Sequence, residues 1–121
     1  PYNTIMVATT TQSKKAKGRK LQQKIQKDII ETFNLSENDV RSTSMGTNGC
    51  DILLSDAARA LFPYAIECKA QEKLSISSWW EQTSENAEKE QLTPLLIFKQ
   101  SRKKPLVCLR WEDFLSLISN Q

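Results

Sequence analysis

The segment Tyr64–Ala70, with the sequence YAIECKA, constrains the fold most because it combines strand-like alternation with two charged side chains. Successive residues of a β-strand point to opposite faces of the sheet. Glu67 and Lys69 therefore share one face, while Ile66 and Cys68 share the other and belong to the core. The segment predicts a strand that brings a carboxylate and an ammonium group together on one side.

The rest of the chain predicts helices and strands around this strand. An apolar residue at every fourth position from Leu21 to Phe33 indicates a helix over about 13–35, which ends near Asn34. The other expected elements are a short strand near Val40, strands at 51–55, 95–99 and 106–110, a helical turn at 57–61, and helices at 75–91 and 111–119. The order α-β-β-β-α-β-β-α predicts an α/β fold with a central mixed β-sheet flanked by helices.

The length of 121 residues suits one domain, which we expect at 13–121 after a flexible lead of residues 1–12.

Ser78 and Glu81 have the spacing of a capping box at the start of a helix. Of the adjacent Trp79 and Trp80, we expect one in the core and the other at a subunit interface or against a nucleotide. The apolar residues expected to face inward from the last helix are Phe114, Leu115 and Ile118.

Basic residues gather in two clusters, one in the N-terminal quarter of the chain and one at Arg102–Lys104. The whole chain has 17 Lys and Arg against 14 Asp and Glu. Such clusters suit a polyanion such as DNA, and a solvated helix face with a polar turn explains them equally well. The members that we expect at phosphate groups are Lys15, Lys17, Arg19, Lys20, Arg102, Lys103 and Lys104.

The chain has no histidine and three cysteines. The absence of histidine excludes Ser-His-Asp and Cys-His catalysis and argues against a zinc site. The odd cysteine count without a CxxC motif argues against a disulfide framework and favours a reducing interior, the cytoplasm. No apolar run approaches the ~20 residues of a membrane span. Catalysis would rest on carboxylates, lysine, water and a hard metal ion.

Asp51 stands at the start of the strand before YAIECKA. If the two strands pair as an antiparallel hairpin, Asp51 falls beside Cys68, between Glu67 and Lys69. Converging carboxylates stay ionised only with a cation between them, and such oxygen ligands suit Mg²⁺ or Mn²⁺. The ion can polarise a phosphoryl oxygen, and Lys69 can orient water or stabilise charge on phosphorus. The alternative is a strand-start aspartate and an ordinary surface Glu–Lys pair.

The order of Gly49-x-Asp51 and Glu67-x-Lys69 resembles the PD-(D/E)xK nuclease superfamily. The strongest local likeness is to the Holliday-junction resolvases of archaea and to small phage endonucleases related to them. The stretches that carry it, between residues 17 and 71, are Lys17-Gly18-Arg19-Lys20-Leu21-Gln22, Arg41-Ser42-Thr43-Ser44-Met45-Gly46, Asp51-Ile52 and Ile66-Glu67-Cys68-Lys69.

This resemblance implies a restriction-endonuclease-like core and a DNA endonuclease that uses Mg²⁺, with Mn²⁺ as a substitute. Asp51 and Glu67 would bind the metal together with the backbone carbonyl of Cys68, and Lys69 would position the attacking water. The loop residues that would contact DNA are Arg41, Ser42 and Ser44. A Holliday junction or other branched DNA would be the substrate in DNA recombination, cut symmetrically by a homodimer in a bacterial or phage-infected cell.

Two glutamines are further candidates for the catalytic site. The resolvases carry a glutamate on the first helix where this chain has Gln22, which falls on the apolar stripe. A buried polar side chain needs a partner, so Gln22 would bind water or backbone near the site, unless it is a helix-surface residue. Gln82, on the helix after the lysine strand, could face the site or lie in solvent. Two alternatives stay open: a less selective phage or restriction-like duplex or flap endonuclease, and a non-catalytic DNA-binding module, which Gln22 in place of the glutamate would suit.

Overall fold

The computed structural model describes residues 11–44 and 49–120, so most of the expected N-terminal lead lies outside the described residues. Helix α2 (Thr11–Phe33) begins two residues before its predicted start and continues through Gly18, which is buried. It ends as predicted at Asn34, whose φ of 55° is left-handed, a common way to end a helix.

The elements after α2 follow the predicted order. They are β1 (Val40–Ser42), β2 (Ile52–Leu54), α3 (Asp56–Leu61), β3 (Tyr64–Ala70), α4 (Ile76–Glu90), β4 (Thr93–Lys99), β5 (Leu106–Cys108) and α5 (Trp111–Ser119). β1 and β2 form an antiparallel pair, whereas β3 runs parallel to β4 and β5 antiparallel to β4. The α/β class with a mixed sheet between helices is therefore confirmed, with the strands divided between two sheets.

The antiparallel hairpin considered from the sequence does not form between β2 and β3, which belong to separate sheets and have α3 between them along the chain. Ser55 begins α3, and its hydroxyl accepts a hydrogen bond from the Ala58 N–H at 3.1 Å. The two sheets still meet at one point, where the Asp51 N–H donates to the Ile66 carbonyl at 3.0 Å. The expected neighbourhood of Asp51 and β3 thus exists without a strand ladder.

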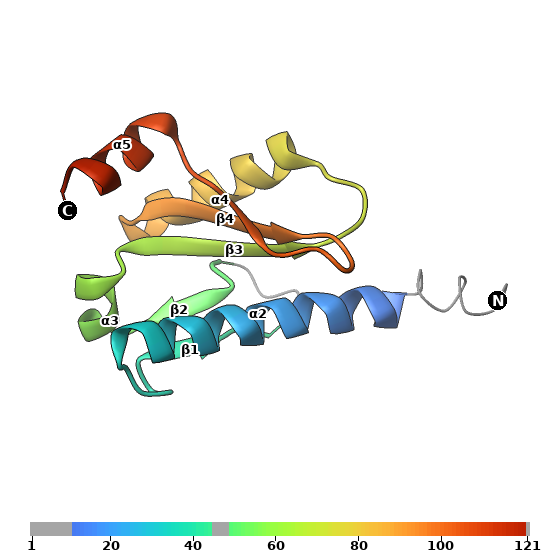
Figure 1. Cartoon of the computed structure of the whole chain (residues 1–121), viewed down its shortest axis with the longest axis horizontal. Helices are drawn as coiled ribbons and strands as arrows, with labels where there is room; N and C mark the ends of the chain where they lie inside the picture. The colour runs from blue at the N-terminus through green and yellow to red at the C-terminus, as the bar shows by residue number, and fades with distance from the viewer. Residues whose placement is uncertain (1–10, 45–48, 121) are drawn as a thin grey trace, which may run out of the picture.

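Helices α2 and α4 cover opposite faces of the sheet (Figure 1). The α2 side buries Leu21, Ile25, Ile29, Ile66, Cys68, Leu95 and Ile97. The α4 side buries Trp79, Ala87, Ala65, Leu96 and Phe98. Each large apolar side chain removed from water contributes about 2–3 kcal/mol to folding, so β3 and β4 are held firmly on both faces.

Two local predictions at the start of α4 have different outcomes. The capping box at Ser78 is wrong: Ser75 precedes the first turn, and the Ser78 hydroxyl donates to the Ser75 carbonyl at 3.1 Å. The prediction of one buried tryptophan is confirmed by Trp79, whose ring centroid lies 6.3 Å from that of Phe98. Trp80 packs partly buried against the same cluster.

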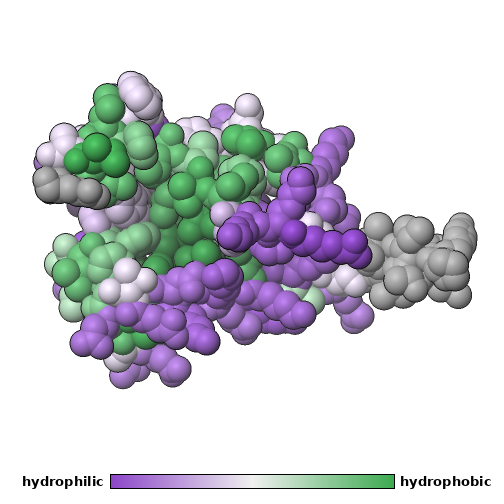
Figure 2. Space-filling view, viewed as in Figure 1, coloured by the Kyte–Doolittle hydropathy of each residue, from purple (hydrophilic) through white to green (hydrophobic). Residues whose placement is uncertain are grey.

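The prediction that α5 faces inward is wrong. Phe114, Leu115 and Ile118 are 43%, 46% and 53% exposed, and no residue of α5 is buried within the described chain. Figure 2 shows hydrophobic side chains gathered over α5, at the upper left of the view. The helix has an apolar surface with no partner in the described part of this chain. Among the described residues, no helix is long and apolar enough to cross a membrane.

Candidate active site

Asp51 is fixed where the two sheets meet. Its Oδ2 accepts a hydrogen bond from the Cys68 N–H at 2.7 Å, and its own N–H donates to the Ile66 carbonyl. The Thr43 N–H and hydroxyl both donate to the Asp51 carbonyl, at 2.9 and 3.1 Å. Backbone contacts on both sides therefore place this carboxylate against the edge of β3 that faces away from β4.

Glu67 lies on β3 beside Asp51 and is only 4% exposed. Its carboxyl group lies close enough to that of Asp51 for the charge of Asp51 to raise the pKa of Glu67. The Asn86 amide of α4 lies 3.5 Å from Glu67 Oε2 and donates to the Gly49 carbonyl at 3.1 Å. The Lys69 Nζ is 3.9 Å from Glu67 Oε1. The structure thus brings Asp51, Glu67 and Lys69 together, as the sequence predicted.

The two carboxyl groups perturb each other strongly. Burial raises the pKa of Asp51, against the hydrogen bond from Cys68 and the charge of Lys69, which lower it. Burial, and then the charge of Asp51, raise the pKa of Glu67 to about 7. A proton shared between the groups relieves their repulsion, and a cation placed between them would do the same.

Gln22 of α2 completes this cluster from the other side. It is 3% exposed, so the alternative of a helix-surface residue is wrong and the prediction that it lies on the buried stripe is confirmed. Its Oε1 accepts a hydrogen bond from the Ser42 hydroxyl at 2.8 Å, and its side chain lies close enough to Asp51 to lower the pKa of that carboxyl group. The residue in the place of the resolvases' glutamate therefore lies beside a candidate metal ligand.

The donor atoms at this cluster fit a hard divalent cation. The buried Glu67 and the partly buried Asp51 carboxylates converge, and the Cys68 carbonyl opens onto the same strand edge as the Cys68 N–H that binds Asp51. The Cys68 thiol instead faces α2, and burial raises its pKa. No group of three His, Cys, Asp or Glu side chains meets within the described residues. The remaining ligands of a Mg²⁺ ion would be water and phosphate oxygens, as is common for this ion.

Comparison with known proteins identifies the family of the chain. The profile of the family described as "Phage putative PDDEXK endonuclease" matches residues 13–121. The chain belongs to this family. No match was found among curated proteins or solved structures. The family confirms the PD-(D/E)xK superfamily inferred from the motif, and it makes the chain a phage nuclease with DNA as its substrate.

The predicted DNA-contacting residues of this phage endonuclease divide between two flanks of α2. Lys17, Lys20 and Arg102 line a cavity of about 300 Å³. Arg19, Arg41, Ser42 and Ser44 line a hollow of about 650 Å³ on the other flank. Lys15, Lys103 and Lys104 are exposed outside both. The second hollow adjoins the active site, because Ser42 is the hydrogen-bond partner of Gln22.

Asn86 is the residue of the endonuclease site that the sequence analysis missed. It follows Gln82 by one helical turn, so both lie on the same side of α4. Asn86 is buried and reaches Glu67, whereas Gln82 is exposed. The helix after the lysine strand therefore contributes a polar side chain to the site, one turn later than predicted, and the role of Gln82 stays a prediction.

Proposed function

We propose that this phage endonuclease hydrolyses DNA phosphodiesters with Mg²⁺ held by Asp51, Glu67 and the Cys68 carbonyl, and that Mn²⁺ substitutes for it. The observation that carries the proposal is the buried Glu67 carboxyl group, which lies beside the partly buried carboxyl group of Asp51 and 3.9 Å from the Lys69 ammonium. The ion supplies Lewis-acid polarisation of a phosphoryl oxygen. The absence of histidine leaves carboxylates and lysine as the groups able to handle protons and charge at this site.

The residues around the cluster have separate tasks in this proposal. The Lys69 side chain is 22% exposed, so its ammonium can meet both Glu67 and an entering substrate. It orients the attacking water and stabilises the negative charge that develops on phosphorus. Gln22 and Asn86 are positioning residues in this proposal, since Asn86 donates a hydrogen bond to Glu67 and Gln22 lies close enough to Asp51 to lower its pKa.

A cleavage assay with metal and site variants tests this chemistry. Labelled four-way, flapped and linear DNA is incubated with Mg²⁺, Mn²⁺ or EDTA. We expect cleavage to require the metal and to fall at least about a hundredfold in Glu67→Gln and Lys69→Ala. Glu85→Gln, an exposed carboxylate of α4, is the matched control and should cleave normally. Binding without cleavage, unchanged in the Glu67 and Lys69 variants, would instead support a non-catalytic DNA-binding module.

We further propose that the substrate is branched DNA, with the Holliday junction of recombination as the specific form. The likeness of residues 17–71 to the junction resolvases supports this choice. Basic side chains on both flanks of α2 also suit strands that diverge from one point. Cutting confined to the four-way substrate supports the proposal, whereas equal cutting of linear duplex favours the less selective phage or restriction-like enzyme. The reaction would take place in the cytoplasm of the infected cell.

The proposed enzyme acts as a homodimer, because resolving a junction takes two symmetric cuts. The apolar surface of β5 and α5 supports this assembly: Val107, Trp111 and Phe114 are 61%, 71% and 43% exposed in the single chain. Apolar patches of this kind mark protein interfaces. Light scattering should give twice the mass of one chain, and Trp111→Glu with Phe114→Ser should give monomers. A monomeric parent protein at micromolar concentration would refute the dimer.

A further inference from the structure

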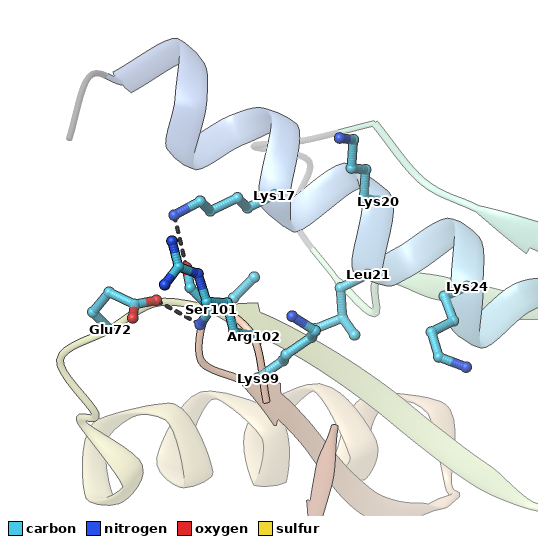
Figure 3. Close-up of a pocket in the computed structure, with 9 residues that line it drawn as sticks. Lys17, Lys20, Leu21, Lys24, Glu72, Lys99, Ser101 and Arg102 are labelled. Atoms are coloured by element: carbon cyan, nitrogen blue, oxygen red, sulfur yellow. Dashed lines mark hydrogen bonds between the residues drawn. The ribbon is translucent and has the colours of Figure 1, made fainter. Parts of the chain in front are cut away.

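A basic cavity of about 300 Å³ lies between α2 and the turn that joins β4 to β5 (Figure 3). Its cationic lining residues are Lys17, Lys20, Lys24, Lys99 and Arg102. Glu72 is the one carboxylate among the described lining residues, and Leu21 and Ala70 give the lining an apolar part. Lys24 and Lys99 were not among the residues that the sequence analysis assigned to DNA.

The charges of this cavity are poorly compensated within the described chain. Lys24 pairs with Asp28 at 2.8 Å, but none of the ion pairs between described residues involves the other four cations. The Glu72 carboxylate accepts a hydrogen bond from the Ser101 N–H at 2.8 Å and is also attracted by Lys17 and Lys99, so it offsets one positive charge and leaves the cavity net positive. Cations gathered in this way repel one another, so a bound anion would stabilise the arrangement.

Hydrogen bonds hold the cavity in one shape. The Gln100 amide donates to the Glu72 carbonyl at 2.7 Å, which ties the β4–β5 turn to the loop after β3. The Lys17 ammonium donates to the Ser101 hydroxyl at 2.9 Å, which ties the same turn to α2. Because these contacts join residues of the protein itself, little ordering of the turn is needed on binding.

The backbone of Arg102 adds an independent observation. Its φ of 63° lies in the left-handed region, which glycine adopts freely and a longer side chain adopts at a cost in stability. The turn nevertheless carries an arginine there, and Arg102 lines the cavity (Figure 3). Strained backbone that presents a charged side chain to a cavity is typical of binding sites.

We propose that this cavity is a second, non-catalytic phosphate site, which binds a phosphate group of the DNA other than the one being cut. This inference rests on the proposed function. Lysine and arginine match phosphate oxygens, and Leu21 and Ala70 offer apolar contact to the adjoining sugar. Ala70 lies two residues, about 7 Å, along β3 from Cys68 and faces away from Glu67. The bound phosphate therefore cannot be the scissile one.

DNA binding measured by fluorescence anisotropy in EDTA tests the site, because no cleavage interferes. The probes are one duplex with 5′-hydroxyl ends, the same duplex with 5′-phosphate ends, and inorganic phosphate as competitor. Lys99→Gln and Arg102→Gly should each weaken DNA binding about tenfold. Each should also make the plot of log association constant against log salt concentration less steep, by about one unit of slope. Lys27→Gln, an exposed lysine of α2 outside the cavity, is the matched control and should change affinity less than about twofold.

Arg102→Gly separates binding from folding. Glycine adopts the left-handed conformation freely, so this variant should melt at a higher temperature than the parent while binding DNA more weakly. If the cavity variants bind both duplexes more weakly, the site binds internal phosphates. If they lose affinity only for the 5′-phosphorylated duplex, the site binds strand ends. An unchanged salt slope in Lys99→Gln, or equal weakening by Lys27→Gln, overturns the proposal.

The same variants distinguish failure of this inference from failure of the proposed function. If Glu67→Gln leaves cleavage intact while Lys99→Gln still weakens binding, the proposed chemistry is wrong and the phosphate site stands. If cleavage requires Glu67 while both cavity variants bind DNA like the parent protein, the chemistry stands and the phosphate site is wrong.

Discussion

Replacing Glu67 by glutamine should stabilise the metal-free protein while abolishing cleavage. The pKa of Glu67 is raised to about 7 from its ordinary 4.5, first by burial and then by the charge of Asp51. The folded protein therefore holds this proton more tightly than the unfolded chain, and folding loses stability as the pH rises from about 4.5 to about 7. Glutamine resembles the protonated acid, since its amide can donate to Asp51 while its oxygen faces Asn86.

The size of this effect follows from the pKa difference. At about 1.4 kcal/mol per pKa unit, the ionised Glu67 costs roughly 3 kcal/mol at pH 8. We expect Glu67→Gln to raise the free energy of unfolding by roughly 2–3 kcal/mol at pH 8 in EDTA, and by less than about 1 kcal/mol at pH 5. For a chain of this length the melting temperature should rise by roughly 10 °C at pH 8.

Urea unfolding at both pH values, with and without Mg²⁺, measures this prediction. Mg²⁺ should stabilise the parent protein and have little effect on Glu67→Gln, because the ion binds the ionised carboxylate pair. Glu85→Gln should lie within about 0.5 kcal/mol of the parent throughout. If Glu67→Gln is no more stable at pH 8, or gains as much at pH 5, then Glu67 is not held protonated by its surroundings and the reasoning about the pair fails.

Three further substitutions test other parts of the site and core. Gln22→Glu should tighten Mg²⁺ binding about tenfold in calorimetry and lower stability in EDTA at pH 8, because it adds a third carboxylate to the cluster at a buried position; unchanged affinity would show that Gln22 lies outside the reach of the ion. Lys69→Met should reduce kcat at least about a hundredfold while DNA affinity changes less than about threefold, since only one positive charge among many is lost; proportional loss of both would make Lys69 a binding residue. Trp79→Ala should cost about 3–5 kcal/mol in urea unfolding and Trp80→Ala clearly less, and the reverse order would contradict the observed packing.

The elements that the sequence predicted well are those with a strong local period. β3 spans the predicted Tyr64–Ala70, and the stripe that begins at Leu21 is buried along α2. In both cases the pattern of side chains within the segment decides which face meets the core. The expected meeting of Asp51 with β3 also exists, although the predicted hairpin does not, because one backbone hydrogen bond and one carboxylate contact replace the ladder.

The features that the sequence did not predict depend on how elements pack against one another. Asn86 became a site residue because of the rotation of α4 over the sheet, which periodicity alone fixes only to within a turn. The apolar face of α5 was assigned inward because amphipathic helices usually cover their own core, yet Phe114 and Ile118 are about half exposed. A sequence pattern marks a face as apolar, but it does not show whether the partner lies in the same chain or in another.

Asp51 has a structural task that complicates its use as a test of catalysis. Its N–H bonds the Ile66 carbonyl and its carboxylate bonds the Cys68 N–H, and these two contacts join the β1–β2 pair to the β3–β4–β5 sheet. Asp51→Ala removes the acceptor and leaves the buried Cys68 N–H without its partner, which costs about 1–3 kcal/mol apart from any chemistry. Asp51→Asn keeps an oxygen for that N–H and removes the charge. Loss of cleavage in Asp51→Asn with an unchanged melting temperature would therefore report on catalysis, whereas loss in Asp51→Ala would not distinguish catalysis from the separation of the two sheets.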